Sequence, residues 1–179
     1  PTGHDTFAIV ALPTHDNLLL AADISGLITL EINYAPVMQI NQLALKAALS
    51  IANSAYSIIP LSNHPNLLAV ASGWALDDEE YGEVLLVSIS DIFHPAIVGT
   101  VSTKETAYSI TTIPNRPSLL AVADGIAGMS LVDISNILQP TLVATVDTGA
   151  SADSITTIPN RPNLLVVADR GNAVAIINI

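Results

Sequence analysis

The sequence predicts an all-β protein built from a repeated unit of four short strands. The first observation is a repeat, because residues 109–124 return almost letter for letter as residues 154–169. The second is the pattern inside each unit, where short runs of branched aliphatic residues alternate with Pro, Asn and Gly. The third is composition: 50% of the residues are hydrophobic and only 12% are charged. Such a chain buries the apolar faces of each unit against neighbouring copies.

The repeat divides the chain into four units that form a single array over residues 1–179. Their approximate bounds are 6–54, 55–106, 107–151 and 152–179. The first strand of each unit carries one matching position, occupied by Phe7, Tyr56, Tyr108 and Asp153. These positions are 49, 52 and 45 residues apart. The spacing fits the roughly 40 to 50 residues of a propeller blade and is too long for a leucine-rich repeat.

The third unit shows the expected strands most clearly. They fall at residues 109–113, 119–123, 129–134 and 141–147. The first connection is Pro-Asn-Arg-Pro, which favours a hairpin loop because proline presets φ and asparagine tolerates left-handed geometry. The second connection contains Gly125 and Gly128, which adopt positive φ easily. A four-stranded antiparallel meander repeated around an axis is a β-propeller blade.

A family resemblance is carried by residues 128–136, Gly-Met-Ser-Leu-Val-Asp-Ile-Ser-Asn, followed by Gln139-Pro140 and Leu142-Val143. This segment resembles the LVIVD repeat family, and the resemblance covers essentially the whole chain. It implies a β-propeller, often on bacterial or archaeal cell-surface proteins. It implies no catalytic motif and no defined chemistry.

The last unit is shorter than the others. It ends at Ile179, the position that matches Ile134, so we expect the last blade to lack its outer strand. Residues 1–6 are too few to supply this strand. We therefore expect that the chain alone does not close the ring and is a segment of a larger propeller. The alternatives are a four-bladed ring with a ragged last blade, and closure by a second copy.

Charge and composition exclude several classes of function. The formal net charge is −11 with only five Lys and Arg residues, whereas nucleic-acid binding needs clustered basic residues. Zero cysteines exclude disulfides, thiol catalysis and thiolate metal sites. No run is long and apolar enough to predict a membrane span. The sequence also holds no Gly-x-Ser-x-Gly, His-Glu-x-x-His or phosphate-binding glycine motif.

Two repeat positions place charges at opposite ends of the blades. The turn between the first and second strands carries His15, His64, Arg116 and Arg161. The end of the second strand carries Asp23, Asp124 and Asp169, with Ser72 in the second unit. One interpretation is a ring with a cationic and an anionic mouth. The favoured one is structural, with each aspartate bonding backbone N–H groups of its own turn.

One insertion interrupts the repeat. The second unit exceeds the third by seven residues, at residues 74–83, which hold the only tryptophan and five of the sixteen acidic residues. The favoured interpretation is a solvated acidic loop whose aromatic residues fold back onto the blade. A second is a partner contact through Trp74 and Tyr81. A third is a calcium site, and the sequence points to no other cofactor. The calcium ligands would be Asp77, Asp78, Glu79, Glu80 and Glu83.

These observations together predict a non-enzymatic propeller that acts as an interaction scaffold, extracellular or at the cell surface. Its expected partner is a protein, for example another copy or the rest of the same polypeptide. The alternative is an enzyme or metal-binding propeller whose active residues lie mostly outside this segment.

Overall fold

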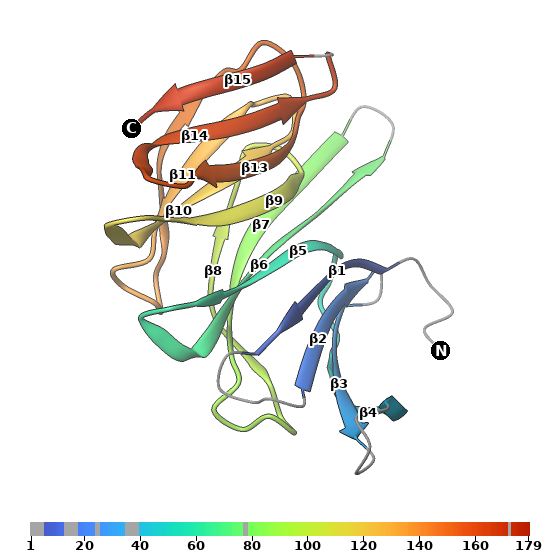
Figure 1. The fold of residues 1–179 in the computed structure, drawn as a ribbon. Coiled ribbons are helices and arrows are strands. Elements are labelled where there is room, and N and C mark those ends of the chain that lie inside the picture. The colour runs from blue at the N-terminus through green and yellow to red at the C-terminus, as the bar shows by residue number, and fades with distance from the viewer. Residues whose placement is uncertain (1–5, 13–17, 24–25, 35–39, 77–78, 172) are drawn as a thin grey trace.

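The structure is a computed structural model that describes residues 6–12, 18–23, 26–34, 40–76, 79–171 and 173–179. Fifteen strands in these residues form four separate antiparallel sheets. We call the sheets blades 1 to 4, in chain order. Figure 1 shows them following one another around an arc, from blade 1 at the bottom of the view to blade 4 at the top.

Each blade is a meander in which consecutive strands are neighbours. Blade 1 comprises β1 (Thr6–Ala11), β2 (Leu18–Asp23), β3 (Gly26–Tyr34) and β4 (Ile40–Leu49). Blade 2 comprises β5 (Ser54–Leu61), β6 (His64–Leu76), β7 (Glu79–Ser88) and β8 (Ala96–Ser102). Blade 3 comprises β9 (Ala107–Ile113), β10 (Arg116–Asp124), β11 (Met129–Asp133) and β12 (Thr141–Val146). Blade 4 comprises β13 (Ala152–Ile158), β14 (Arg161–Asp169) and β15 (Ala173–Asn178).

The inner strands hold the arc together, because β1 packs on β5, β5 on β9 and β9 on β13. The predicted all-β fold of four-stranded antiparallel units is confirmed. The fourth sheet has three strands in the described residues, as expected. Among these residues, no helix has the length and hydropathy needed to span a membrane.

The predicted turn chemistry is also confirmed. Asn115 and Asn160 adopt φ of 63° and 62° in the β9–β10 and β13–β14 turns. Gly125 and Gly128 adopt φ of 51° and 88° between β10 and β11. Strand β10 begins earlier than expected, so its hairpin turn contains only residues 114–115. Pro114 and Asn115 are therefore the two central residues of the turn. Proline suits the first of these positions, which needs a negative φ, and asparagine suits the second, which needs a positive φ.

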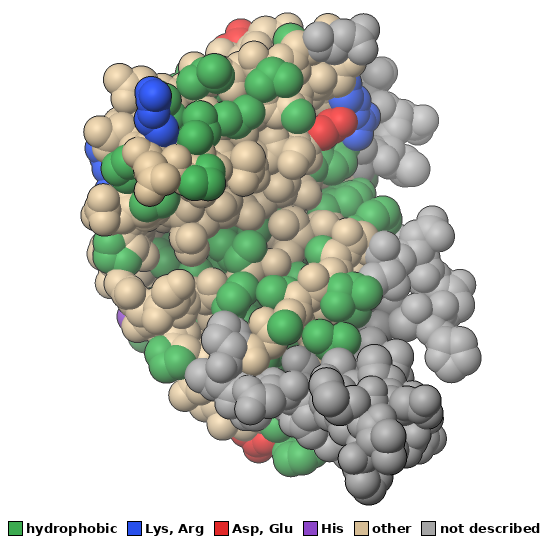
Figure 2. Space-filling model, viewed as in Figure 1, with side chains coloured by type: hydrophobic (Ala, Val, Ile, Leu, Met, Phe, Trp, Pro, Cys, Tyr) green, Lys and Arg blue, Asp and Glu red, His purple; other side chains and the backbone are tan. Residues whose placement is uncertain are grey.

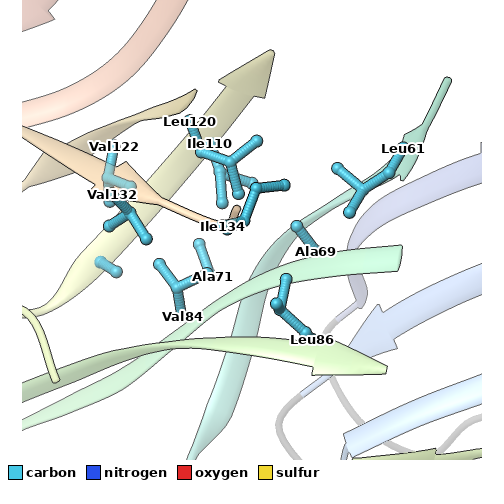
Figure 3. Packing of buried hydrophobic residues seen from close by; sticks show 11 residues of the cluster. Leu61, Ala69, Ala71, Val84, Leu86, Ile110, Leu120, Val122, Val132 and Ile134 are labelled. Carbon is cyan, nitrogen blue, oxygen red and sulfur yellow. The ribbon is translucent and has the colours of Figure 1, made fainter. Parts of the chain in front are cut away.

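Three hydrophobic cores lie between successive blades. In blade 3, Leu120 and Val122 face blade 2, whereas Ala121 and Ala123 face blade 4. The side chains of a strand alternate between its two faces, so a blade covered on both sides needs continuous apolar runs. Figure 3 shows the core between blades 2 and 3, to which Ala71 and Val84 contribute from blade 2 and Ile110 and Val132 from blade 3.

The prediction of a loop at residues 74–83 is wrong. Strands β6 and β7 continue as a paired hairpin, with Trp74 opposite Tyr81 and Ala75 opposite Glu80. The inserted residues thus prolong the ladder of blade 2 beyond its neighbours, and every additional cross-strand pair stabilises this extension. Asp77 and Asp78, at the tip, lie outside the described residues.

Candidate functional site

The inner strand of every blade contains a β-bulge at the same repeat position. In blade 3, Ala107 pairs with Asp124 and Ser109 with Ala123, so Tyr108 is an extra residue without a partner. The same shift leaves one extra residue in each of the other inner strands. These residues are Phe7 in β1, Tyr56 in β5 and Asp153 in β13. A bulge redirects the side chain of its extra residue, so all four blades present this position in the same way.

The three aromatic residues at the bulges form a row along the inner strands, and Arg170, which directly follows β14, extends it. We call these four residues the aromatic row: Phe7, Tyr56, Tyr108 and Arg170. The Phe7 and Tyr56 ring centroids are 5.0 Å apart, and those of Tyr56 and Tyr108 are 5.1 Å apart with the rings 60° to each other. The Arg170 guanidinium lies 5.0 Å from the Tyr108 centroid. These distances are those of edge-to-face aromatic and cation–π contacts.

The end of the row is an electrostatically mixed site. Arg170 Nε lies 2.8 Å from the carboxylate of Asp153, and this hydrogen bond raises the pKa of the Arg170 guanidinium. Burial raises the pKa of the Tyr108 hydroxyl above its usual 10.0, and the charge of Glu80 raises it further. Burial likewise raises the pKa of the Glu105 carboxyl, with Glu80 and Asp124 adding to the effect. The Tyr108 end of the row therefore has the carboxylate of Glu80 near it and the Arg170–Asp153 ion pair against it.

Buried carboxylates beneath this surface tie blades 3 and 4 to the linkers before them. Asp124 has no exposed surface, and its carboxylate accepts hydrogen bonds from the Lys104 and Glu105 backbone N–H groups at 3.2 and 2.9 Å. Ser130 Oγ donates a third bond, at 2.5 Å. In blade 4, Thr148 Oγ1 donates to Asp169 at 3.0 Å. The expectation that these aspartates bond backbone N–H groups of their own turns is wrong for Asp124 and Asp169. The backbone donors to Asp124 and the hydroxyl donor to Asp169 lie in the preceding interblade linkers, and Ser130 lies in β11. The side chain of Asp23 lies outside the description of the structure.

Blade 2 achieves a similar contact with the acid on the other strand. Glu83 of β7 lies opposite Ser72 of β6 and is only 7% exposed. Its Oε1 accepts hydrogen bonds from Asn53 Nδ2 at 3.0 Å and Ser72 Oγ at 3.4 Å. Glu83 is therefore a structural carboxylate and not a member of a solvated acidic loop.

The two predicted partner-binding residues, Trp74 and Tyr81, form a directly opposed cross-strand pair near the end of the β6–β7 hairpin. Tyr81 is 38% exposed and Trp74 is partly buried. The hairpin adjoins the aromatic row, because Thr106 Oγ1 donates to the Trp74 carbonyl oxygen at 2.9 Å and Thr106 precedes Tyr108 by two residues. We call the surface made by the aromatic row and this pair the hairpin face.

The predicted calcium ligands are not gathered around one point. Glu80 and Glu83 are three residues apart on one strand, so their side chains leave from opposite faces. Glu80 Oε2 accepts a hydrogen bond from the Thr106 backbone N–H at 3.5 Å, whereas Glu83 faces Asn53. The prediction that these two residues share a single calcium ion is therefore wrong. Asp77 and Asp78 lie outside the described residues, and Glu79 begins β7. Among the described residues, no group of three or more potential ligands is placed to hold a metal ion.

The predicted basic positions lie at the opposite end of the blades from the hairpin face. His64, Arg116 and Arg161 begin β6, β10 and β14, directly after the hairpin turns. Arg116 Nη2 donates to the carbonyl oxygen of Ile179 at 2.9 Å, which links blades 3 and 4. His64 lines a hollow of about 290 Å³ between the turns of blades 2 and 3. His15 lies outside the described residues.

Comparisons with known proteins address the fold. No protein-family model matches the chain, and no curated protein matches it. Among solved structures, a chain of the "Crystal Structure of Mitotic Checkpoint Complex" matches over 98% of this chain with a TM-score of 0.71. The fold is a β-propeller. The sequence identity is 12%, so the likeness concerns the propeller alone, and this propeller chain spans 49% of the solved chain. The resemblance to LVIVD repeats stays a prediction.

The aromatic row was not predicted as a site. In the sequence, Phe7, Tyr56 and Tyr108 mark equivalent positions of the units. An aromatic residue at one repeat position in three of the four units is a pattern that could have indicated a shared surface. The contact of Arg170 with Tyr108 was not visible, because it depends on the bulge and on the packing of blade 4 against blade 3.

Proposed function

We propose that this protein is a non-enzymatic β-propeller scaffold that binds a protein partner through its hairpin face, outside the cell or at its surface. The observation that carries the proposal is that the β6–β7 hairpin, which holds the Trp74–Tyr81 pair, contacts the start of β9 next to the aromatic row. Partly exposed aromatic side chains on rigid strands are the residues that dominate the energetics of protein interfaces. Phe7 is 45% exposed at one end of this surface.

The charges of the hairpin face favour a partner with basic side chains. Glu80 and Glu105 lie close enough to Tyr108 and to each other to shift pKa values there. Arg170 shows that a guanidinium is accommodated on a ring of this row. The similar solved chain belongs to the Mitotic Checkpoint Complex, which supports a protein partner. The inner-strand hydroxyl of Ser109 accepts a hydrogen bond from the Ile155 backbone N–H at 3.3 Å, which supports a structural role for this hydroxyl over a catalytic one.

Affinity capture from the producing organism tests the proposal, followed by binding measurements with the purified captured protein. We expect Trp74→Ala and Tyr81→Ala each to weaken binding roughly tenfold or more, because truncating an interface anchor loses its buried contact area. Phe93→Ala is the matched control, since Phe93 is 61% exposed in the β7–β8 connection and outside the hairpin face.

Equal binding by wild type and both hairpin variants would refute the hairpin face as the binding surface. Thermal melts of all variants separate lost binding from lost folding. Labelling of intact cells with a membrane-impermeant reagent tests the proposed location, and protection of the protein from the reagent would contradict it.

A further inference from the structure

Blade 4 exposes an apolar sheet face on the side away from blade 3. We call it the rear face of blade 4: Leu164, Val166, Ala168, Val174 and Ile176. Val166 lies opposite Ile176 and Ala168 opposite Val174 in the β14–β15 ladder. Val174 and Ile176 are 67% and 66% exposed. Figure 2 shows hydrophobic side chains over this uppermost sheet.

The equivalent face of blade 3 is covered. A shift of 45 residues brings the rear face of blade 4 onto Leu119, Ala121, Ala123, Met129 and Leu131. Met129 is 1% exposed and Ala121 is completely buried. This face packs against the front of blade 4, where Ile155, Leu165 and Val167 complete the core. The rear face of blade 4 thus occupies the same repeat positions as a surface that accepts a blade, and each of these positions carries an aliphatic residue.

Blade 1 presents the complementary surface at the other end of the arc. Its front face contains Ile9 paired with Ala21, together with Leu19. These residues match Ile155, Val167 and Leu165 in the repeat register. Ile9 is 61% exposed, whereas Ile155 is 5% exposed. At Ile9, the front of blade 1 therefore exposes a position that blade 4 buries against blade 3, whereas Ala21 is 2% exposed.

We propose that a second copy of this chain covers both faces, with blade 1 of each copy packed on the rear face of blade 4 of the other. The contact continues the interface between blades 3 and 4, so it needs no new kind of packing. A contact between two different surfaces of a protomer closes only when its rotation completes a ring. Each copy contributes four blades, so two copies related by a two-fold axis would place eight blades in one ring.

Charge does not oppose this contact locally. The chain carries a formal charge of −11, but the rear face of blade 4 consists of aliphatic residues, with the neutral Ser154 and Thr156 of β13 opposite Ala168 and Val166. The ion pair of Arg170 with Asp153 lies exposed at the end of the aromatic row. Burial of the rear face thus requires no desolvation of an unpaired charge.

Light scattering of the 179-residue chain during size-exclusion chromatography tests the proposal. The expected mass is twice the 18.6 kDa of one chain. Ile176→Glu and Ile9→Lys should each weaken self-association roughly 100-fold or more, because either buries an unpaired charge. Leu138→Glu is the matched control, since Leu138 is 72% exposed between β11 and β12. This control should remain dimeric.

A mixing experiment identifies which faces meet. An equimolar mixture of the Ile176→Glu and Ile9→Lys chains should recover the dimer, because one interface is then native and the other pairs opposite charges. The variants should melt as cooperatively as the wild type, since both side chains are exposed within a chain. A wild-type monomer, an open series of higher masses, a dimeric Ile176→Glu variant or an unproductive mixture would each overturn the proposal. In these cases another protein or another segment covers the face.

Discussion

At the scale of the residue, the buried carboxylate of Asp124 is the contact that joins blade 3 to the linker before it. Its oxygens accept hydrogen bonds from two backbone N–H groups of that linker and from Ser130 Oγ. Water cannot take the place of these donors at the carboxylate, because Asp124 is completely buried. A carboxylate that accepts several backbone hydrogen bonds is both satisfied itself and satisfies the chain around it.

Replacement of this carboxylate should destabilise the protein. We expect Asp124→Ala to lower the free energy of unfolding by about 3 kcal/mol, because the linker N–H groups lose a charged acceptor in a buried place. Asp124→Asn should fall between this variant and the wild type, since an amide oxygen replaces only part of the carboxylate. Urea denaturation followed by circular dichroism measures both. An Asp124→Ala variant as stable as the wild type would contradict the role of this contact.

The raised pKa of Glu105 should make the stability of the protein depend on pH. Burial and the charges of Glu80 and Asp124 raise the pKa of Glu105 above 4.5 in the folded protein. A raised folded-state pKa contributes stability below the unfolded-state value, and this contribution is lost as pH rises through the folded-state pKa. We therefore expect Glu105→Gln to melt higher than the wild type at pH 8. The difference should shrink as the pH falls towards 4.5.

Melting curves recorded between these two pH values check this expectation. Ser102→Ala, an exposed neighbour, serves as the control and should show no pH-dependent difference from the wild type. A difference for Glu105→Gln that is constant with pH would be contradictory.

At the scale of the element, the β6–β7 hairpin is held against blade 3 by a close backbone approach. A Cβ atom added at Gly82 would overlap the Glu105 carbonyl oxygen and lie 2.8 Å from the Ala107 backbone nitrogen. The Thr103 backbone N–H also donates to the Gly82 carbonyl oxygen at 2.9 Å. The hairpin therefore approaches the start of β9 at a distance that only glycine permits.

Substitution of this glycine should loosen the hairpin. We expect Gly82→Ala to lower the free energy of unfolding by about 2 kcal/mol, because backbone atoms must move to admit the methyl group. The amide chemical shifts of β7 and of residues 103–107 should change most. Thr100→Ala, an exposed residue of the adjacent strand β8, is the control. Unchanged stability and shifts for Gly82→Ala would show that the approach is looser than the structure indicates.

The inner strands illustrate why elements are harder to predict in detail than in number. Ala107 and Ile110 contribute to the same core although they are three residues apart, because the bulge at Tyr108 shifts the alternation by one residue. A strict two-residue period places these two side chains on opposite faces. The bulge is a property of the pairing between β9 and β10, so the sequence of β9 alone does not reveal it.

At the scale of the whole molecule, the order of the blades was predictable because the repeat itself encodes it. Residues 109–124 and 154–169 share their turns, strands and asparagine conformations. The partners of Asp124 were not predictable in the same way, because they lie about twenty residues back in a linker. The strands at residues 74–83 were not predicted, because the acidic residues there favoured an exposed loop. Cross-strand pairing instead keeps the backbone of these residues extended.

The link between a blade and its preceding linker has a consequence for how such arrays grow. The linker that begins at Thr103 and the acid at Asp124 belong to one contiguous stretch of about 45 residues, and Thr148 and Asp169 repeat them at the same spacing. A gene duplication that copies this stretch in frame therefore copies both the blade and the linker residues that bind its buried aspartate. Each new unit arrives with its own attachment, so lengthening the array requires no matching mutation elsewhere in the gene.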